Sequence, residues 1–302
     1  MTRPPVIAGI ASIPARGQSL RQAIESICHQ VDHVEVVLNG YKAVPDWLRH
    51  ERITVTTSQD VGDHADNAKF MGMGRYDECI YFAIDDDILY PADYVARMLE
   101  CMSRYGGRAA VGVHGSFVPK RPGTFLGRRV FCFWDLLPFD APCSYAGTGT
   151  IALSRHMMPA SPLSLFTDTG MSDLFVASSL KRRGIPVICI DRPEGWLRKI
   201  PNPGHPSLWQ RAQTDSVRQD RLLGEVEPWG VVDLIDRCQG EVLENLTPGV
   251  RVALDAAAAI AHGDGMPDSL RAELARHGDK VGSLVQHYAA PDAEQAPRTS
   301  AS

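Results

Sequence analysis

Three consecutive aspartates, Asp85, Asp86 and Asp87, follow a short apolar run at residues 80–84 and form the densest group of potential ligands in this chain. The run has no polar alternation, which predicts a strand buried on both faces with the aspartates at its carboxyl end. Adjacent carboxylates repel one another and cannot be buried unpaired, so we expect a cation to neutralise them. Oxygen ligands of this kind favour Mg²⁺ or Mn²⁺, which usually also holds substrate phosphates. The alternative is an acidic turn that caps the next helix.

The segments around the aspartates alternate between strand and helix. Residues 6–13, 34–38 and 53–57 have the pattern of strands, and a helix is expected at residues 19–30 with Ser19 as its N-cap. A helix at 91–105, strands at 109–117 and within 145–154, a helix at about 172–184 and a strand at 185–190 follow. This order predicts an α/β fold with a mostly parallel, Rossmann-like sheet flanked by helices. Ligands of such sheets bind outside the carboxyl ends of the strands.

Polar residues follow the first three predicted strands, at the edge where a ligand would bind. They are Arg16, Asn39, Asp60, Asp63 and Lys69, the last on a helix expected to run to about residue 74. A lysine supplies a point charge near a diphosphate, and Asp60 or Asp63 could accept hydrogen bonds from a base or a sugar hydroxyl. The alternative for Arg16 is a residue in a solvated turn. For the segment that carries Asp60 and Asp63, the alternative is a helix N-terminus whose acidic residues are stabilised by the helix dipole.

Two further residues of interest lie later in the chain. Asp173 stands near the start of an amphipathic helix, where it could act on a ligand or serve only as a capping residue. His205 lies in a proline-rich loop, in which a lone histidine is more often structural. The irregular stretch at 118–142 is expected to be a loop that covers a site, and it includes Trp134; Trp134, Trp196 and Trp209 could face a ligand or pack in the core.

Composition limits the class of protein. With 302 residues, 44% of them hydrophobic, the chain can build one large or two modest domains. Its net charge of -5 argues against nucleic acid as a partner, because backbone contact needs a clustered basic surface. The 7 cysteines show no CxxC spacing, which favours reduced thiols in a cytoplasmic enzyme over a zinc site or a disulfide framework.

The ends of the chain complete the expected organisation. No stretch approaches the roughly 18 apolar residues of a membrane span, so membrane association is expected to be at most peripheral. Residues 1–224 are predicted to be a catalytic domain and residues 225–289 a helical C-terminal extension. Residues 290–302 are predicted to be a disordered tail.

Three motifs in sequence order resemble the GT-A type glycosyltransferases, in particular the inverting enzymes of glycosyltransferase family two that build bacterial surface polysaccharides. IDDDI at 84–88 is similar to the DxD motif, GTGTIALSR at 147–155 to the Gly-rich acceptor-side segment, and MSDLFVASSLKRRG at 171–184 to the Glu-Asp helix. The resemblance covers about residues 5–215. It departs at Ser172, where an acidic residue is usual, and at ASIPAR (11–16), which replaces the nucleotide motif containing Asp-x-Ser.

The resemblance implies a metal-dependent glycosyltransferase of hexosyltransferase type. Mn²⁺ or Mg²⁺ would be held by Asp85, Asp87 and His205, and Asp173 would be the general base. The substrate would be a nucleotide-sugar donor, expected to be a UDP-sugar. The residues that line its binding site would be Arg16, Asn39, Asp60, Asp63, Lys69, Asp85 and Asp86. The acceptor would be a saccharide or a lipid-linked saccharide.

Two other functions fit parts of the pattern. A nucleotidyltransferase that makes a nucleotide sugar would also use a doubly wound sheet and metal-binding carboxylates, but it normally has a Gly-rich basic loop after the first strand. ASIPARG at 11–17 supplies only one arginine there. A carbohydrate-binding protein with a degenerate site is the other alternative, and the presence of Asp85, Asp87 and Asp173 argues against it.

Overall fold

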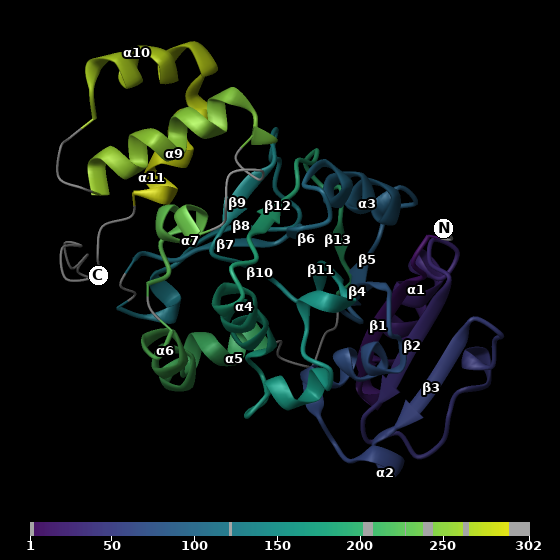
Figure 1. Ribbon diagram of the computed structural model, residues 1–302. Helices are drawn as coiled ribbons and strands as arrows, with labels where there is room; N and C mark the ends of the chain where they lie inside the picture. The colour runs from purple at the N-terminus through teal and green to yellow at the C-terminus, as the bar shows by residue number, and fades with distance from the viewer. Residues whose placement is uncertain are drawn as a thin grey trace.

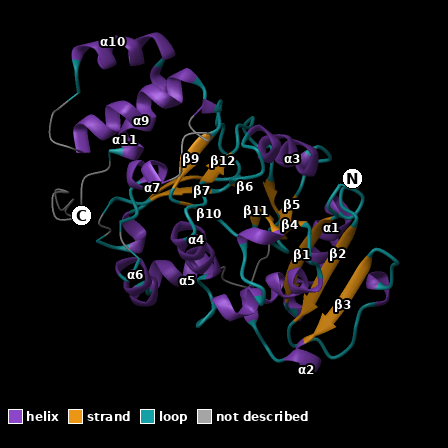
Figure 2. Ribbon diagram, viewed as in Figure 1, coloured by secondary structure: helices purple, strands orange, loops and turns teal. Residues whose placement is uncertain are grey.

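The computed structural model describes residues 3–120, 123–201, 208–226, 228–237, 244–261 and 266–289. An eight-stranded sheet forms its centre, with helices around it (Figure 2). Its strand order is β3-β2-β1-β4-β11-β6-β12-β9. The strands are β1 (Val6–Ser12), β2 (His33–Leu38), β3 (Ile53–Thr57), β4 (Ile80–Ile84), β6 (Ala110–Gly112), β9 (Ala141–Cys143), β11 (Thr150–Ser154) and β12 (Val187–Cys189).

The sheet is mixed, with most neighbours parallel, as in Rossmann-like folds. Strands β1 to β4 pair in parallel and β12 is parallel to β6, which confirms the α/β class. The predicted mostly parallel sheet is confirmed, and it has two antiparallel members. β11 runs antiparallel to both β4 and β6, and β9, which begins in the stretch expected to be irregular, runs antiparallel to β12. β11 follows a tight turn after β10 (Tyr145–Ala146), but β10 belongs to a separate three-stranded sheet, so this turn does not set the direction of β11 against β4 and β6.

Four of the described α-helices belong to the part of the chain that forms the sheet. They are α1 (Gly17–Ile27), α2 (Ser58–Val61), α3 (Tyr94–Arg104) and α4 (Ser172–Arg182). Two of them, α2 and α4, carry the candidate residues Asp60 and Asp173. α1 buries Leu20, Ile24 and Ile27 on the face that packs into the core. The segment that carries Lys69 is a helix, as expected, and it is of the 3-10 type, η3 (Ala65–Arg75). Gly72 in η3 lies so close to Glu35 of β2 that a Cβ there would overlap the glutamate side chain.

The predicted strand at 109–117 is two strands in different sheets. β6 belongs to the central sheet, and β7 (Gly115–Phe117) joins β10 and β8 (Arg129–Phe131) in a three-stranded sheet. The following stretch, 118–142, was expected to be irregular. It contains β8, the short helix η4 (Phe125–Gly127) and the start of β9. A third sheet pairs β5 (Ile88–Leu89), just after the aspartates, with β13 (Arg198–Lys199).

Helices dominate the C-terminal part of the chain (Figure 1). They are α5 (Leu208–Thr214), α6 (Val217–Gly224), α7 (Val231–Arg237), α9 (Pro248–Ala261), α10 (Asp268–His277) and α11 (Asp279–Tyr288). The rings of His287 and Tyr288, at the end of α11, pack against Phe117 of β7, so α11 rests on the three-stranded sheet. No helix within the described ranges is long and apolar enough to cross a membrane. The predicted tail, 290–302, lies outside these ranges.

Candidate functional site

Asp85, Asp86 and Asp87 follow β4 directly, at the predicted edge of the sheet, and each has a different environment. The carboxylate of Asp85 is paired with the Lys69 ammonium group and keeps 39% of its side chain exposed. Asp86 is buried and accepts hydrogen bonds from Ser12 Oγ at 2.5 Å and from Arg16 at 2.8 Å. Asp87 lies 3.7 Å from the same arginine and is 14% exposed. Cations from two other elements therefore already face the three carboxylates.

The aspartates still carry more negative charge than these cations offset. Burial and the charge of Asp85 raise the pKa of Asp87 to about 6, and Arg16 only partly opposes them. Burial also raises the pKa of Asp86, against the effects of Arg16 and Ser12. A pKa raised by neighbouring carboxylates indicates a place where an added cation would be favourable.

The donor chemistry of Asp85 and Asp87 fits Mn²⁺ or Mg²⁺, since two carboxylates can hold such an ion together with substrate phosphates. Within the described residues, no group of three or more His, Cys, Asp or Glu side chains is arranged to hold a metal ion. His205, the third predicted ligand, lies outside those residues. Substrate oxygens would therefore have to supply part of the coordination.

Lys69 lies at the centre of a group of acidic residues. Its side chain is buried on η3, and burial alone would lower the pKa of its ammonium group. The charge of Asp85, aided by Asp66 and Asp173, outweighs burial and raises the pKa of Lys69. Lys69 therefore stays charged and links electrostatically the aspartates after β4 to Asp173 on α4.

Asp173 is held by the Gly-rich turn that precedes β11. The Thr148 main-chain N–H and hydroxyl both donate to Oδ1 of Asp173, at 2.8 and 2.6 Å, and the hydroxyl oxygens of Thr148 and Ser172 lie 2.7 Å apart. Burial raises the pKa of Asp173, while Thr148 and Lys69 oppose the rise. A Cβ on Gly149 would overlap the Asp85 carboxylate, so only glycine lets the turn approach so closely. One turn thus contacts both Asp85 and Asp173.

Asn39, Asp60 and Asp63 make hydrogen bonds outside this cluster. Asp60 accepts a hydrogen bond from Thr57 and Asp63 from the backbone N–H of Ala65. Asn39 is buried and donates to the carbonyl oxygen of Ala65, while its own Oδ1 has no partner in the described chain. Ala65 has a φ of 49°, a left-handed conformation unusual for a residue with a side chain, which these hydrogen bonds hold.

Several site residues were missed at the level of sequence. Ser12 binds Asp86, and Asp66 accepts hydrogen bonds from the backbone N–H groups of Gly170 at 2.6 Å and Ser172 at 3.4 Å. Burial, with Arg128 and Arg192, lowers the pKa of His114 to about 4 against the opposite effect of Asp85. Ser12 could have been found from its place at the end of β1. No local pattern marks the others, because their partners come from distant segments.

Three tryptophans, Trp134, Trp196 and Trp209, are considered as ligand contacts, and the two whose side chains the structure describes differ in their surroundings. Trp196 is buried and donates to Asp93, with the guanidinium group of Arg97 over its ring, so its role is in packing. Trp134 is 44% exposed. The side chain of Trp209 lies outside the described part of the chain. Of these three, Trp134 is the one that the structure shows to be exposed and so accessible to a ligand.

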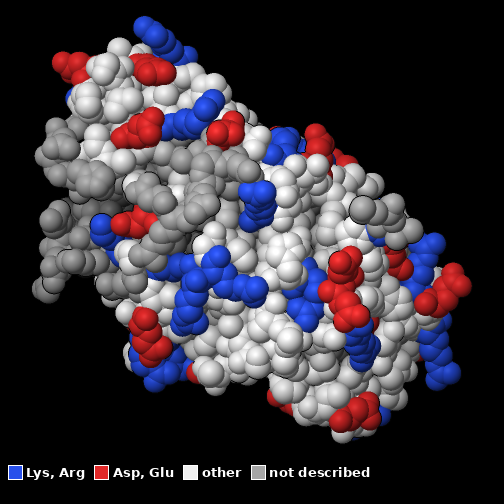
Figure 3. All heavy atoms as spheres, viewed as in Figure 1, with Lys and Arg blue, Asp and Glu red and all other residues white. Residues whose placement is uncertain are grey.

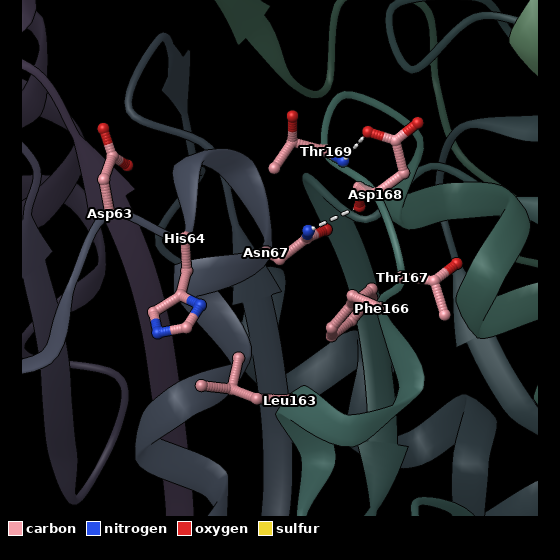
Figure 4. A pocket seen from close by; sticks show the side chains of 8 residues that line it. All are labelled: Asp63, His64, Asn67, Leu163, Phe166, Thr167, Asp168 and Thr169. Carbon is pink, nitrogen blue, oxygen red and sulfur yellow. Dashed lines mark hydrogen bonds between the residues drawn. The ribbon is translucent and has the colours of Figure 1, made fainter.

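A pocket opens beside this cluster, between the start of η3 and the segment before α4 (Figure 4). Its cavity volume is about 140 Å³, and it is lined by Asp63, His64, Asn67, Leu163, Phe166, Thr167, Asp168 and Thr169.

Acidic and basic side chains are interspersed over the face of the molecule shown in Figure 3.

Comparisons with known proteins give no family for this chain: neither a scan against protein-family models nor a search of curated proteins found a match. The resemblance to GT-A glycosyltransferases therefore stays a prediction. Its three motifs fall on the carboxyl end of β4, the turn before β11 and the first turn of α4.

Proposed function

We propose that this protein is a metal-dependent glycosyltransferase with a GT-A type fold. It would transfer a sugar from a nucleotide-diphosphate sugar to an acceptor hydroxyl, with inversion at the anomeric carbon, in the synthesis of a polysaccharide or glycoconjugate. One observation carries the proposal. The turn at 147–149 contacts both Asp85, in the aspartate group suited to a diphosphate-bound cation, and Asp173, a partly buried carboxylate suited to a base.

The donor would bind at the carboxyl ends of β1 and β4. Asp85 and Asp87 would hold Mn²⁺ or Mg²⁺, which would offset the charge that develops on the leaving diphosphate. Arg16 and Lys69 already lie against these carboxylates and would add positive charge near the diphosphate oxygens. Asp86, bonded to Ser12 and Arg16, would fix the arginine in place.

Asp173 would take the proton of the acceptor hydroxyl. The acceptor oxygen forms a bond to the anomeric carbon while the bond from that carbon to the diphosphate oxygen breaks, and the hydroxyl proton passes to Asp173. Oδ1 of this carboxylate is occupied by Thr148, and no hydrogen bond to Oδ2 is found in the described ranges, so Oδ2 would receive the proton. Its raised pKa makes the carboxylate a better base.

The test is product analysis with a panel of donors. The purified chain would be incubated with Mn²⁺, UDP-, GDP- and dTDP-sugars and mixed oligosaccharide acceptors, and free nucleoside diphosphate would be measured by chromatography. Transfer requires a nucleoside diphosphate and a lengthened saccharide in equal amounts. A parallel incubation contains nucleoside triphosphates and sugar phosphates, and pyrophosphate release there would instead identify a nucleotidyltransferase. Binding of saccharide without either product would leave only a carbohydrate-binding role.

A further inference from the structure

The pocket between η3 and the segment before α4 joins two segments that also carry site residues (Figure 4). Asp63, His64 and Asn67 line it from the η3 side, and residues from 163 to 169 line the other side. At about 140 Å³ it is smaller than the roughly 300–1,000 Å³ typical of drug-sized ligand pockets. The space suits a single ring and not a whole nucleotide.

Asn67 gives the pocket a buried hydrogen-bonding group. Only 4% of this residue is exposed, and its Nδ2 donates to the carbonyl oxygen of Asp168 at 2.9 Å. That carbonyl can only accept, which fixes the orientation of the amide. Oδ1 of Asn67 is then a buried acceptor with no hydrogen-bond partner in the described chain. A buried acceptor of this kind is costly while it lacks a donor. Because Oδ1 is closed to solvent, a ligand hydroxyl would donate to it only after a small shift of the lining.

The rest of the lining has the composition of a neutral sugar site. Leu163 and Phe166 offer an apolar surface to the C–H face of a ring, while His64 and Thr167 offer polar groups around it. Two carboxylates line the pocket and no lysine or arginine does. One of them, Asp168, is paired with Arg218, a residue that is not part of the lining. The pocket therefore disfavours phosphates and sugar acids and suits hydroxyl groups.

Asp66 ties this pocket to the proposed base. It precedes Asn67 on η3 and accepts hydrogen bonds from Gly170 and Ser172, the residues that lead into Asp173. We propose that the pocket is a subsite for one neutral monosaccharide unit of the acceptor. This inference rests on the proposed glycosyltransferase function, since it assigns the ring to the acceptor. A nucleobase in the pocket is the alternative that the experiment must separate.

The experiment uses variants that alter the pocket and leave the aspartate cluster intact. Thr167→Trp fills the space from an exposed position, and His64→Ala removes a polar group. Ser164→Trp is the matched control, because Ser164 is exposed in the same segment and does not line the pocket. Folding of each variant is checked by thermal melting. Saturation-transfer NMR with methyl glucoside, methyl galactoside and methyl N-acetylglucosaminide measures sugar binding, and calorimetry measures UDP binding with Mn²⁺.

We expect at least one glycoside to bind the wild type and Ser164→Trp, and to bind Thr167→Trp about tenfold or more weakly, with a smaller loss in His64→Ala. UDP affinity should be equal in all four proteins. Loss of UDP affinity in Thr167→Trp would mean that the pocket holds the nucleobase of the donor. Equal glycoside binding by Thr167→Trp and the wild type would mean that the sugar binds elsewhere. Either result overturns the subsite. Absence of glycoside binding to the wild type does so too. Failure of UDP, GDP and dTDP alike to bind the wild type with Mn²⁺, while the glycoside effects persist, would instead refute the transferase function and leave a saccharide pocket.

Discussion

The ammonium group of Lys69 is buried against the carboxylate of Asp85, and the two residues come from different elements, η3 and the end of β4. This ion pair connects the donor side of the proposed site to the rest of the cluster. Asp66 and Asp173 also act on Lys69, so a single buried cation faces carboxylates from three segments. Removal of the Lys69 ammonium group is therefore expected to affect both the stability of the fold and the activity of the proposed site.

Lys69→Met should lower the free energy of unfolding by about 1–3 kcal/mol at neutral pH, because it leaves Asp85 without its partner. The double variant Lys69→Met/Asp85→Asn should be less destabilised than the sum of the two single variants, since it also removes the unpaired charge. Urea unfolding of all three proteins measures this. Arg21→Met, which removes an exposed pair with Glu25, is the control and should change stability by about 0.5 kcal/mol or less. Strict additivity would contradict a role for the pair.

Asp87→Asn should weaken the binding of Mn²⁺ together with UDP about tenfold or more while leaving the fold intact. The substitution is nearly isosteric and removes one carboxylate charge from the proposed cation site. Calorimetric titration measures the binding, and Asp46→Asn, which changes an exposed aspartate on the helix η2 (Asp46–Leu48), is the matched control. Unchanged affinity in Asp87→Asn would show that the aspartates form only an acidic turn.

Asp173→Asn should slow transfer by about 10²- to 10⁴-fold with donor affinity nearly unchanged, because a base is needed only when the acceptor proton moves. The hydrogen bonds from Thr148 to Oδ1 can persist with asparagine, so the turn should keep its position. Transfer rates and UDP affinities would be compared with those of Asp233→Asn, whose carboxylate pairs with Lys120 on another part of the molecule. Near-normal transfer by Asp173→Asn would exclude this residue as the base.

The rate of transfer by the wild type should rise with pH through the raised pKa of Asp173, because only the ionised carboxylate can accept a proton. If Asp173 is the base, the residual activity of Asp173→Asn should lack this rise. A pH profile of kcat under saturating donor measures it. The same acidic limb in both proteins would assign the titration to another group.

His114 should make the folded protein less stable in acid. Its pKa is about 4 in the fold against 6.5 for the free side chain, so between these values the unfolded chain takes up a proton that the folded chain does not. Stability from this group is present above pH 6.5 and is lost as the pH falls towards 4. The loss can reach about 3 kcal/mol, since one pKa unit corresponds to roughly 1.4 kcal/mol.

His114→Gln should remove that part of the acid destabilisation. Urea unfolding at several pH values would be compared for the wild type, His114→Gln and His29→Gln, the last changing an exposed histidine. We expect the His29 variant to follow the wild type and the His114 variant to have a flatter profile. Parallel profiles for all three proteins would contradict the buried, neutral state of His114.

The sequence by itself determined the elements that local patterns encode. The apolar run at 80–84 is β4 with the boundaries expected, because a short run without polar alternation suits a strand covered on both faces. The same reasoning located β1, β2 and β3, and it correctly put Asp85, Asp86 and Asp87 at the carboxyl end of β4. Asp173 lies on the first turn of α4, as its helical pattern predicted.

Only the tertiary structure decided which charges meet. Lys69 pairs with Asp85 and Arg16 with Asp86, although 16 and 70 residues separate the partners. The antiparallel direction of β11 and the division of 109–117 into two strands also depend on which neighbours each strand finds. Periodicity reports which face of an element is buried, but partners are set by how distant elements pack. The contact of Gly149 with Asp85 and the pocket beside Asn67 arise at that level, so no local pattern could have shown them.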